Sequence, residues 1–491
     1  MSRDSRAVHG GSHSTERGGG GTGEVSDFGY RQELRRSLTF TDMLIYGLIF
    51  MVPIAPFGIF GSVFQVSGGM VALAYVVGIV AMGFTALSYA SMSGAFPVAG
   101  SVYAYAGRGL HPAVGFLAGW LILLDYVLVP ALLYIVAGAA MHSFFGAVPI
   151  WAWVAFFIVV NTAVNYVGIE MTAKVNRLML AAELVVLAIF LVVGVVAIAL
   201  GRGHGFSFSP VYNSQTFSVG VVFSAVSVAV LSFLGFDGIS TLAEENQGGA
   251  AQVGRATIAA LILAGTLFIV QSWVAALLVP NPSTLLSKGD PAGTAFYDAA
   301  QVAGGHWLSV LTAVATAVAW GFANALVAQA ATSRLLFSMA RDGQLPRLLA
   351  KVHPTHKVPE NATFLVALIS LAVGLYMAER PDGITFLSTL VNFGALTAFL
   401  LLHAAVINHF VIRQGSRDLL RYLVAPALGF LIIGFVIVKA NVAAQRLGFV
   451  WLVIGAVILA VSYATGRRPT LAGLSDAPTD GSGGPGLTSG S

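Results

Sequence analysis

The sequence predicts an all-α polytopic membrane protein with twelve transmembrane helices, and three observations lead to this prediction. Of the 491 residues, 57% are hydrophobic and only 9% are charged, whereas soluble globular chains carry about 25% charged residues. Twelve segments are apolar enough, and long enough, to cross a bilayer, which takes about 20 residues in a helix. Lys and Arg gather in alternate connections, as they do in the cytoplasmic loops of membrane proteins.

The predicted spans divide into two groups of six, and several exceed the minimum length, which indicates tilt, a break or an extension beyond the bilayer. The first six cover about 40–66, 70–96, 112–140, 150–168, 176–200 and 217–242. The second six cover about 256–280, 304–338, 361–378, 383–407, 422–440 and 446–465. Residues 1–36 and 467–491 are polar and Gly-rich, so we expect disordered cytoplasmic tails on either side of a twelve-helix domain at 37–466.

The positive charges give the expected orientation. With the N-terminus in the cytoplasm, 19 Lys and Arg residues fall in cytoplasmic segments and five in outer loops. Arg334 lies near the inner end of span eight. The sequence therefore predicts a multi-pass protein of the plasma membrane with both termini in the cytoplasm.

Two spans are interrupted in their middle. Span one contains MVPIAPFG, in which Pro53 and Pro56 each remove a backbone donor. Span six contains GFDG, with Asp237 between two glycines. The two breaks are five spans apart, and an odd number of helices per repeat inverts the second repeat. Broken segments in corresponding positions indicate the binding site of a secondary transporter, although Gly and Pro can also merely kink a membrane helix.

Three acids lie well inside predicted spans: Asp125, Glu183 and Asp237. An intramembrane acid is a functional-site hypothesis, and its partner must be named. Every Lys and Arg falls in a tail, a loop or a span end, so the expected partner is a proton, a metal ion, a helix N-terminus or a cationic substrate. The structural alternatives are a helix cap for Asp237, a protonated acid bonded to a neighbouring helix for Asp125, and a bond across helices for Glu183, which has Arg177 nearby in sequence.

Glu244 and Glu245 fall at the cytoplasmic end of span six, where the helix dipole disfavours them. We therefore expect basic partners there, such as Arg334 or Arg341. The pairs would form either a latch that closes the inner side or an ordinary interfacial ion pair. Asn324, Gln329, Asn392 and His403 are other polar residues within spans, and the sequence predicts that they bond between helices.

The chain contains no HExxH, GxSxG or GxxxxGK motif, so the sequence does not predict an enzyme. It contains no cysteine, which excludes disulfides and Cys-ligated metals. His353 and His356 stand in a basic loop without further ligands, so no metal site and no cofactor are expected. The net charge of +4 gives no reason to expect a nucleic-acid partner, and the oligomeric state stays open.

Three stretches resemble the amino acid–polyamine–organocation (APC) superfamily, over roughly residues 35–465. They are FPVAGSVYAYAGRGLHPAVGFLAGW (96–120), SFLGFDGISTLAEE (232–245) and LVNFGALTAFLLLHAAVINHF (390–410). Within the superfamily, LLDYVLVP (123–130), LGFDGISTLAEE and NFGALTAF are most similar to bacterial putrescine importers.

The resemblance implies a LeuT-like fold: two inverted five-helix repeats, at about 40–200 and 217–407, followed by two helices at about 422–465. It places the substrate at the breaks of spans one and six, flanked by spans three, eight and ten. The implied binding residues are Pro53, Ile54, Ala55, Asp125, Tyr126, Gly235, Phe236, Asp237 and Trp320.

Two departures from the family pattern bear on the substrate and its coupling. The family usually has a proline-free, Gly-rich break in span one whose N–H groups hold a substrate carboxylate, whereas PIAP stands here. Ile54, Ala55 and Phe57 still have N–H donors, so an amino acid is not excluded. Glu183 stands where many relatives have a lysine near a sodium-site position, so Glu183 either titrates or bonds across helices.

The expected function is therefore secondary active import of a small organic amine, with putrescine as the leading candidate and proton symport by family analogy. In this hypothesis Asp237 binds one ammonium, and Asp125 receives a second or stabilises the first. Aromatic residues such as Tyr126, Phe236 and Trp320 pack the alkyl chain. The main alternative is an amino acid permease of the same superfamily. An antiporter, a channel or sensor, and a polytopic enzyme are further alternatives.

Overall fold

The computed structural model describes Phe28 and residues 33–144, 146–290, 293–380, 383–440 and 442–465. Within these residues every regular element is a helix, apart from one isolated bridge between Leu38 and Asn246. Most of the two predicted tails lies outside the described residues. Leu34, near the end of the N-terminal tail, is buried against the body.

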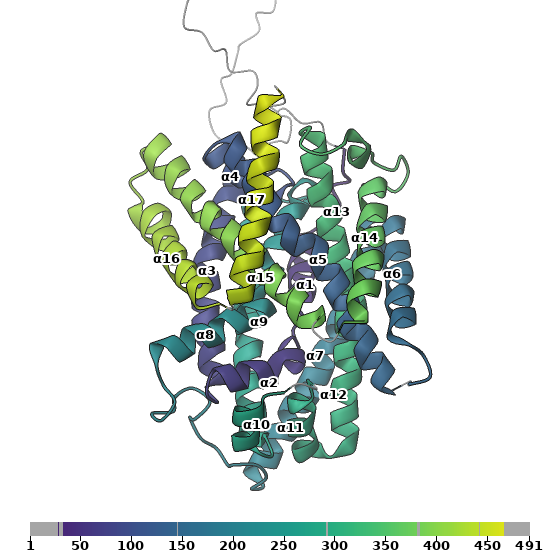
Figure 1. Cartoon of the computed structure of the whole chain (residues 1–491), viewed down its shortest axis with the longest axis vertical. Coiled ribbons are helices and arrows are strands. Elements are labelled where there is room, and N and C mark those ends of the chain that lie inside the picture. The colour runs from purple at the N-terminus through teal and green to yellow at the C-terminus, as the bar shows by residue number, and fades with distance from the viewer. Residues whose placement is uncertain are drawn as a thin grey trace, which may run out of the picture.

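The helices of the first half run mostly along the long axis of the molecule (Figure 1). They are α1 (Phe40–Met51), α2 (Pro56–Val66), α3 (Val71–Ala95), α4 (Ser101–Gly109), α5 (Pro112–Phe144), α6 (Ile150–Val167), α7 (Ile169–Ala199), α8 (Val219–Ala229), η2 (Val230–Phe233) and η3 (Phe236–Glu245).

The second half contains long helices and several short or wide helical turns. They are α9 (Ala251–Leu278), α10 (Pro282–Lys288), α11 (Ala295–Gly304), α12 (His306–Val318), η4 (Ala319–Asn324), α13 (Ala325–Arg341), η5 (Arg347–Ala350), α14 (Glu360–Ala378), α15 (Gly383–Val406), η6 (Ile407–Arg413), η7 (Leu420–Val424), α16 (Ala425–Lys439) and α17 (Val442–Ala464).

The prediction of twelve spans is confirmed within the described residues. Eleven helical segments are individually long and apolar enough to cross a bilayer, and α1 with α2 make a twelfth that is bent by 52° at a short break. Span six, Val219–Glu245, is built from α8, η2 and η3, and span eight, His306–Arg341, from α12, η4 and α13. The chain is therefore a multi-pass membrane protein whose helices one and six are both broken.

The two ends of the bundle differ in the short helices that they carry. Figure 1 shows α4 at one end and α10 and α11 at the other. We call these ends the α4 side and the α10–α11 side. The sequence predicts that the α4 side faces the cytoplasm, because α4 lies in a segment assigned there.

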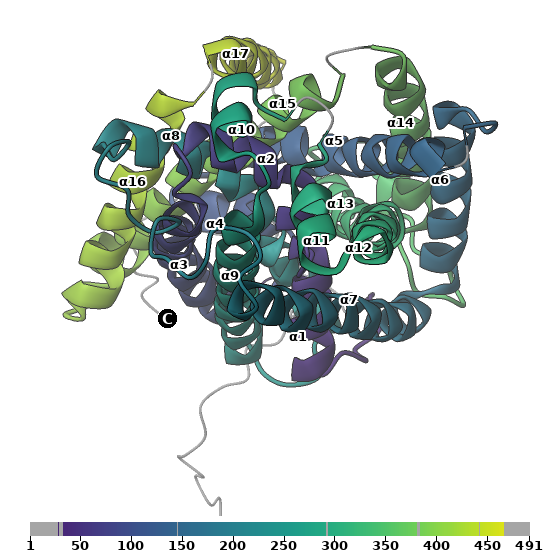
Figure 2. The ribbon, with the colours of Figure 1, turned by 90° about the horizontal axis from the view of Figure 1, so that it is seen from below.

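Burial separates the central helices from the peripheral ones. In span three, formed by α5, 78% of the most apolar window is buried, whereas in span twelve, formed by α17, the share is 11%. Figure 2 shows α6 and α14 together at one edge of the bundle and α16 at the opposite edge. A helix whose surface is mostly apolar and unburied in such a bundle faces lipid, so α17 is peripheral and α5 is central.

Span eight contains a wide turn that the sequence did not predict. The residues Ala319–Asn324 form a π-helical turn, η4, between two regular helices. Gly321 in this turn packs so closely on α5 that an added Cβ would lie 2.4 Å from that of Ala137. Asn161 of α6 donates to the carbonyl of Gly321 at 2.9 Å. Single π-turns within α-helices occur often at functional sites.

Candidate functional site

The break in span one is a tight, self-bonded turn. The N–H of Ala55 donates to the carbonyl of Val52 at 2.7 Å, and that of Phe57 donates to Ile54 at 2.9 Å. Pro53 has no N–H to offer. Of the three amides that the sequence left for a substrate carboxylate, two are therefore engaged inside the turn, and only that of Ile54 has no such bond among the described residues.

The carbonyl of the same turn is held by a neighbouring helix. Gln271 of α9 donates its amide group to the carbonyl oxygen of Pro53 at 2.8 Å. Val52 has a φ of 55°, a left-handed conformation that is unfavourable for a β-branched residue. Such strain persists where the surrounding structure determines the backbone, and the bond from Gln271 is part of that support.

The break in span six packs directly on span one. Gly235 has a φ of 115°, and an added Cβ there would lie 2.8 Å from the ring of Phe50 in α1. At Gly238 an added Cβ would lie 2.4 Å from the same ring. Both glycines of the GFDG motif are therefore required for close approach, and the two breaks meet at the centre of the molecule.

Asp237 is bonded within the protein and does not line the central cavity. It is fully buried. One carboxylate oxygen accepts a hydrogen bond from the Tyr126 hydroxyl at 2.6 Å, and the other accepts from the N–H of Gly235 at 3.2 Å. This is the geometry of a carboxylate that satisfies the free N–H of a broken helix, which is the alternative considered for it from sequence.

Phe236 also faces away from the cavity. Its ring lies 5.9 Å from that of Tyr89 and 5.8 Å from that of Phe399, centroid to centroid, so it belongs to an aromatic cluster between spans two, six and ten. Aromatic pairs at this spacing stabilise packing. The structure therefore gives Phe236 packing contacts, and it does not line the cavity described next.

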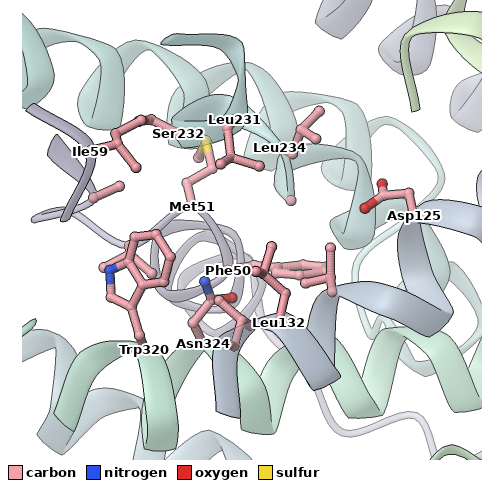
Figure 3. A pocket seen from close by; sticks show the side chains of 15 residues that line it. Phe50, Met51, Ile59, Asp125, Leu132, Leu231, Ser232, Leu234, Trp320 and Asn324 are labelled. Atoms are coloured by element: carbon pink, nitrogen blue, oxygen red, sulfur yellow. The ribbon is translucent and has the colours of Figure 1, made fainter. Parts of the chain in front are cut away.

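A cavity of about 40 Å³ lies where spans one, three, six and eight meet (Figure 3). A water needs roughly 10–15 Å³ of such volume, so there is room for about three waters, and a larger substrate needs the lining side chains to move apart. Most of the lining is apolar. The lining residues are Phe50, Met51, Val52, Ala55, Ile59, Asp125, Val129, Leu132, Leu133, Leu231, Ser232, Leu234, Gly235, Trp320 and Asn324.

Asp125 supplies the only acid of this lining, and the lining contains no Lys, Arg or His. Asp125 is 3% exposed. Among the described residues it makes no hydrogen bond or ion pair, in contrast to Asp237. A carboxylate in such surroundings is costly unless it meets a proton, a cation or a donor. Of the nine binding residues implied by the sequence, four line the cavity: Ala55, Asp125, Gly235 and Trp320.

The π-turn of span eight supplies the other polar groups of the cavity. The Trp320 side chain lies against Gly58 of α2, where an added Cβ would lie 3.0 Å from the indole. Neither the indole nitrogen of Trp320 nor the Oδ1 of Asn324 has a hydrogen-bond partner in the structure. From sequence Asn324 was expected to bond between helices. Its spacing of four residues from Trp320, which is typical of one helix face, is the sequence signal that could have placed it at the cavity.

Glu183 is a second acid without a partner. Its residue is 4% exposed, and both carboxylate oxygens are buried without a hydrogen bond. Arg177, its neighbour in sequence, instead forms an ion pair with Asp42 of α1. Seven residues beyond Glu183, Phe190 packs on Phe57 just after the break in span one. Glu183 therefore lies level with the last turns of α1, on the α4 side of the break.

Ion pairs close the α4 side of the bundle below the cavity. Glu244 receives two hydrogen bonds from Arg341, at 2.8 and 2.6 Å, and a third from the N–H of Ala99 at 2.9 Å. Glu245 pairs with Arg334, and both side chains are buried. The basic partners expected from sequence are therefore present. Among the described residues no group of three or more His, Asp or Glu side chains could hold a metal ion.

Comparisons with known proteins give the family of this chain. A model of the family described as amino acid permease matches residues 37–464. The chain belongs to the amino acid permease family. The low-affinity putrescine importer PlaP of Escherichia coli (strain K12) is 31% identical to this permease over 454 residues, which cover 89% of this chain and 96% of the relative.

Other relatives of this permease carry different substrates in their names. The branched-chain amino acid permease BcaP of Bacillus subtilis (strain 168) is 28% identical, over 87% of this chain and 93% of the relative. The methylthioribose transporter of the same organism is 28% identical, over 77% of this chain and 81% of the relative. The relatives are thus transporters and not enzymes, and they differ in substrate.

Proposed function

We propose that this permease imports a small organic cation across the plasma membrane, with putrescine as the leading candidate. The observation that carries the proposal is the Asp125 carboxylate, which lines the cavity between the two breaks without a partner among the described residues. An ammonium group supplies both the charge and the hydrogen bonds that a buried carboxylate requires. The similarity to a putrescine importer supports the same substrate class.

The break in span one favours a substrate without a carboxylate. An amino acid carboxylate would need free N–H groups at this break, and Pro53 and Pro56 have none. The amides of Ala55 and Phe57 already donate within the turn. The cavity therefore offers an acid to a cation but few donors to an anion.

Ion pairs lie on the α4 side of the cavity. The cavity is formed at the breaks and by residues on their α10–α11 side, such as Ile59 and Leu133, while the pairs of Glu244 and Glu245 with arginines lie on the other side. Import is proposed because of the similarity to an importer, and the membrane potential favours it. Each positive charge moved inward gains about 2.3 kcal/mol per 100 mV, so a dication gains about 4.6.

We propose Glu183 as the group that couples transport to protons. It is buried without a partner among the described residues and lies beside the last turns of α1, just before the break in span one, where a change of protonation could act on the binding site. Glu183→Gln mimics the protonated acid. The variant is expected to keep exchange of labelled substrate but to lose accumulation driven by an imposed proton gradient; accumulation at the wild-type level would remove Glu183 from the mechanism.

Uptake into proteoliposomes tests the substrate assignment. Purified protein is reconstituted, and labelled putrescine is supplied with an inside-negative potential, an imposed proton gradient, or neither. Putrescine is expected to accumulate, and unlabelled diamines should compete while neutral amino acids should not. An absence of putrescine counterflow would refute the assignment.

An amino acid permease is the second candidate function, and the similarity to branched-chain amino acid permeases favours it. The same assay decides between the two. Leucine, isoleucine and valine would then compete for uptake, and putrescine would not.

A further inference from the structure

Asn324 is a polar group of the cavity that the proposed function does not yet use. It is 8% exposed, its Oδ1 has no hydrogen-bond partner, and it lines the cavity from the π-turn of span eight. Figure 3 shows its amide directed into the space between Phe50 and Trp320, while Asp125 enters from the far end of the view. The two side chains therefore approach one cavity from different places along its length.

Contacts between spans three and eight give the separation of these two positions along the bundle. Thr332 of α13 donates to the carbonyl of Tyr126 in α5 at 2.6 Å, and Gly321 packs on Ala137. The two antiparallel helices are thereby aligned at two points. Asn324 is then level with residue 134 of α5, nine residues from Asp125, or about 13 Å at 1.5 Å per residue.

The two polar groups lie at different levels of one cavity, as the two nitrogens of an extended diamine do. In butane-1,4-diamine the two nitrogens are about 6 Å apart when the chain is extended, at standard bond lengths. A hydrogen bond of about 2.8 Å at each end brings the span between two acceptor oxygens to about 12 Å. The lining between the two polar groups includes Val129, Leu132 and Leu231, which suits the methylene chain.

We propose that Asn324 determines specificity by accepting a hydrogen bond from the second ammonium group of a diamine whose first ammonium group pairs with Asp125. The inference rests on the proposed function, since it concerns the same cavity and substrate class. A monoamine of equal length engages Asp125 alone and leaves the oxygen of Asn324 unpaired.

Binding measurements with two probes test the proposal. Isothermal titration of purified, lipid-nanodisc-reconstituted protein with butane-1,4-diamine and with butylamine separates the second contact from the first. In Asn324→Leu the affinity for the diamine is expected to fall about tenfold or more, as for loss of a hydrogen bond to a charged group, while that for butylamine stays within twofold. In Asn324→Asp the preference for the diamine over butylamine should rise.

Asn392→Leu is the matched control, because Asn392 is another asparagine within a span whose Oδ1 has no partner, and it does not line the cavity. It should leave both affinities unchanged. Equal losses of both probes in Asn324→Leu, or no loss of either, would overturn the role of Asn324 while leaving the proposed function intact. If Asn324→Leu does not fold, the test rests on Asn324→Asp. An unchanged preference of that variant for the diamine over butylamine overturns the role of Asn324. A wild-type protein that binds neither amine overturns the proposed function together with this inference.

Discussion

Replacement of Asp125 by Asn removes the one negative charge of the cavity lining while it preserves the shape of the side chain. At a separation of about 3 Å and an effective dielectric constant of about 20, the attraction between a carboxylate and an ammonium group amounts to about 5.5 kcal/mol. Part of this is offset by desolvation of both groups. Truncation of one partner of a buried charge pair typically costs about 2–5 kcal/mol.

A loss of this size corresponds to a decrease in putrescine affinity of about 30-fold to several thousand-fold. The folded protein should not lose stability, because Asp125 makes no hydrogen bond or ion pair with the described residues; relief of an unpaired buried charge should instead leave the melting temperature equal or higher. The measurement is isothermal titration of putrescine against purified wild-type protein and Asp125→Asn, with melting temperatures recorded on the same samples.

Asp298→Asn is the control for this substitution. Asp298 is an exposed acid of α11 that lies outside the cavity lining, so loss of its charge should change putrescine affinity by less than twofold. If Asp125→Asn binds putrescine within threefold of wild type, the cavity acid is not the ammonium partner, and the assignment of the site is wrong.

Three further predictions concern residues in the helices that surround the cavity. Asp237→Asn should lower the melting temperature by the equivalent of about 1.5–3 kcal/mol, because it weakens two hydrogen bonds to a carboxylate; scanning fluorimetry measures this, and an unchanged melting temperature would contradict the capping role. Gly238→Ala should destabilise the fold, because its methyl group would overlap the ring of Phe50; the double variant with Phe50→Leu should recover part of the loss. Arg334→Met should open the α4 side, because it leaves a buried carboxylate unpaired at a cost of about 3–5 kcal/mol. In the naturally cysteine-free chain, a Ser333→Cys reporter should then react faster with a polar thiol reagent added from that side, and an unchanged rate would exclude a latch.

The fold could be predicted from sequence because its strongest signals come from many residues together. Twenty apolar residues in a row exclude any backbone arrangement in lipid other than a helix, and the breaks in spans one and six are marked by Pro and Gly. The predicted limits 40–66 and 150–168 differ from α1–α2 and α6 by at most one residue. The π-turn at Ala319–Asn324 could not be foreseen, since its only local mark is a glycine, and its shape depends on contacts with α5 and α6.

The sequence indicates that the two breaks lie together, but it does not show which residues near them bond to each other. Sequence shows that Asp125 and Asp237 have no basic neighbour, but it cannot show which carboxylate meets a tyrosine hydroxyl. The bond from Tyr126 to Asp237 joins two residues 111 positions apart, and no local pattern reveals such a contact. The pairing of Glu244 and Glu245 with arginines was easier to foresee, because both the acids and the bases lie at the same end of their spans.

The bond between Gln271 and the carbonyl of Pro53 bears on the return half of the transport cycle. If the polar backbone groups of a broken membrane helix bonded only to the substrate, they would have no partner in the empty carrier. Reorientation of the empty carrier would then be slow. Here the protein itself binds one backbone group at each break: Gln271 donates to the carbonyl of Pro53, and Asp237 accepts from the N–H of Gly235. These two groups would therefore not oppose a return step without substrate, which net uptake requires and one-for-one exchange does not.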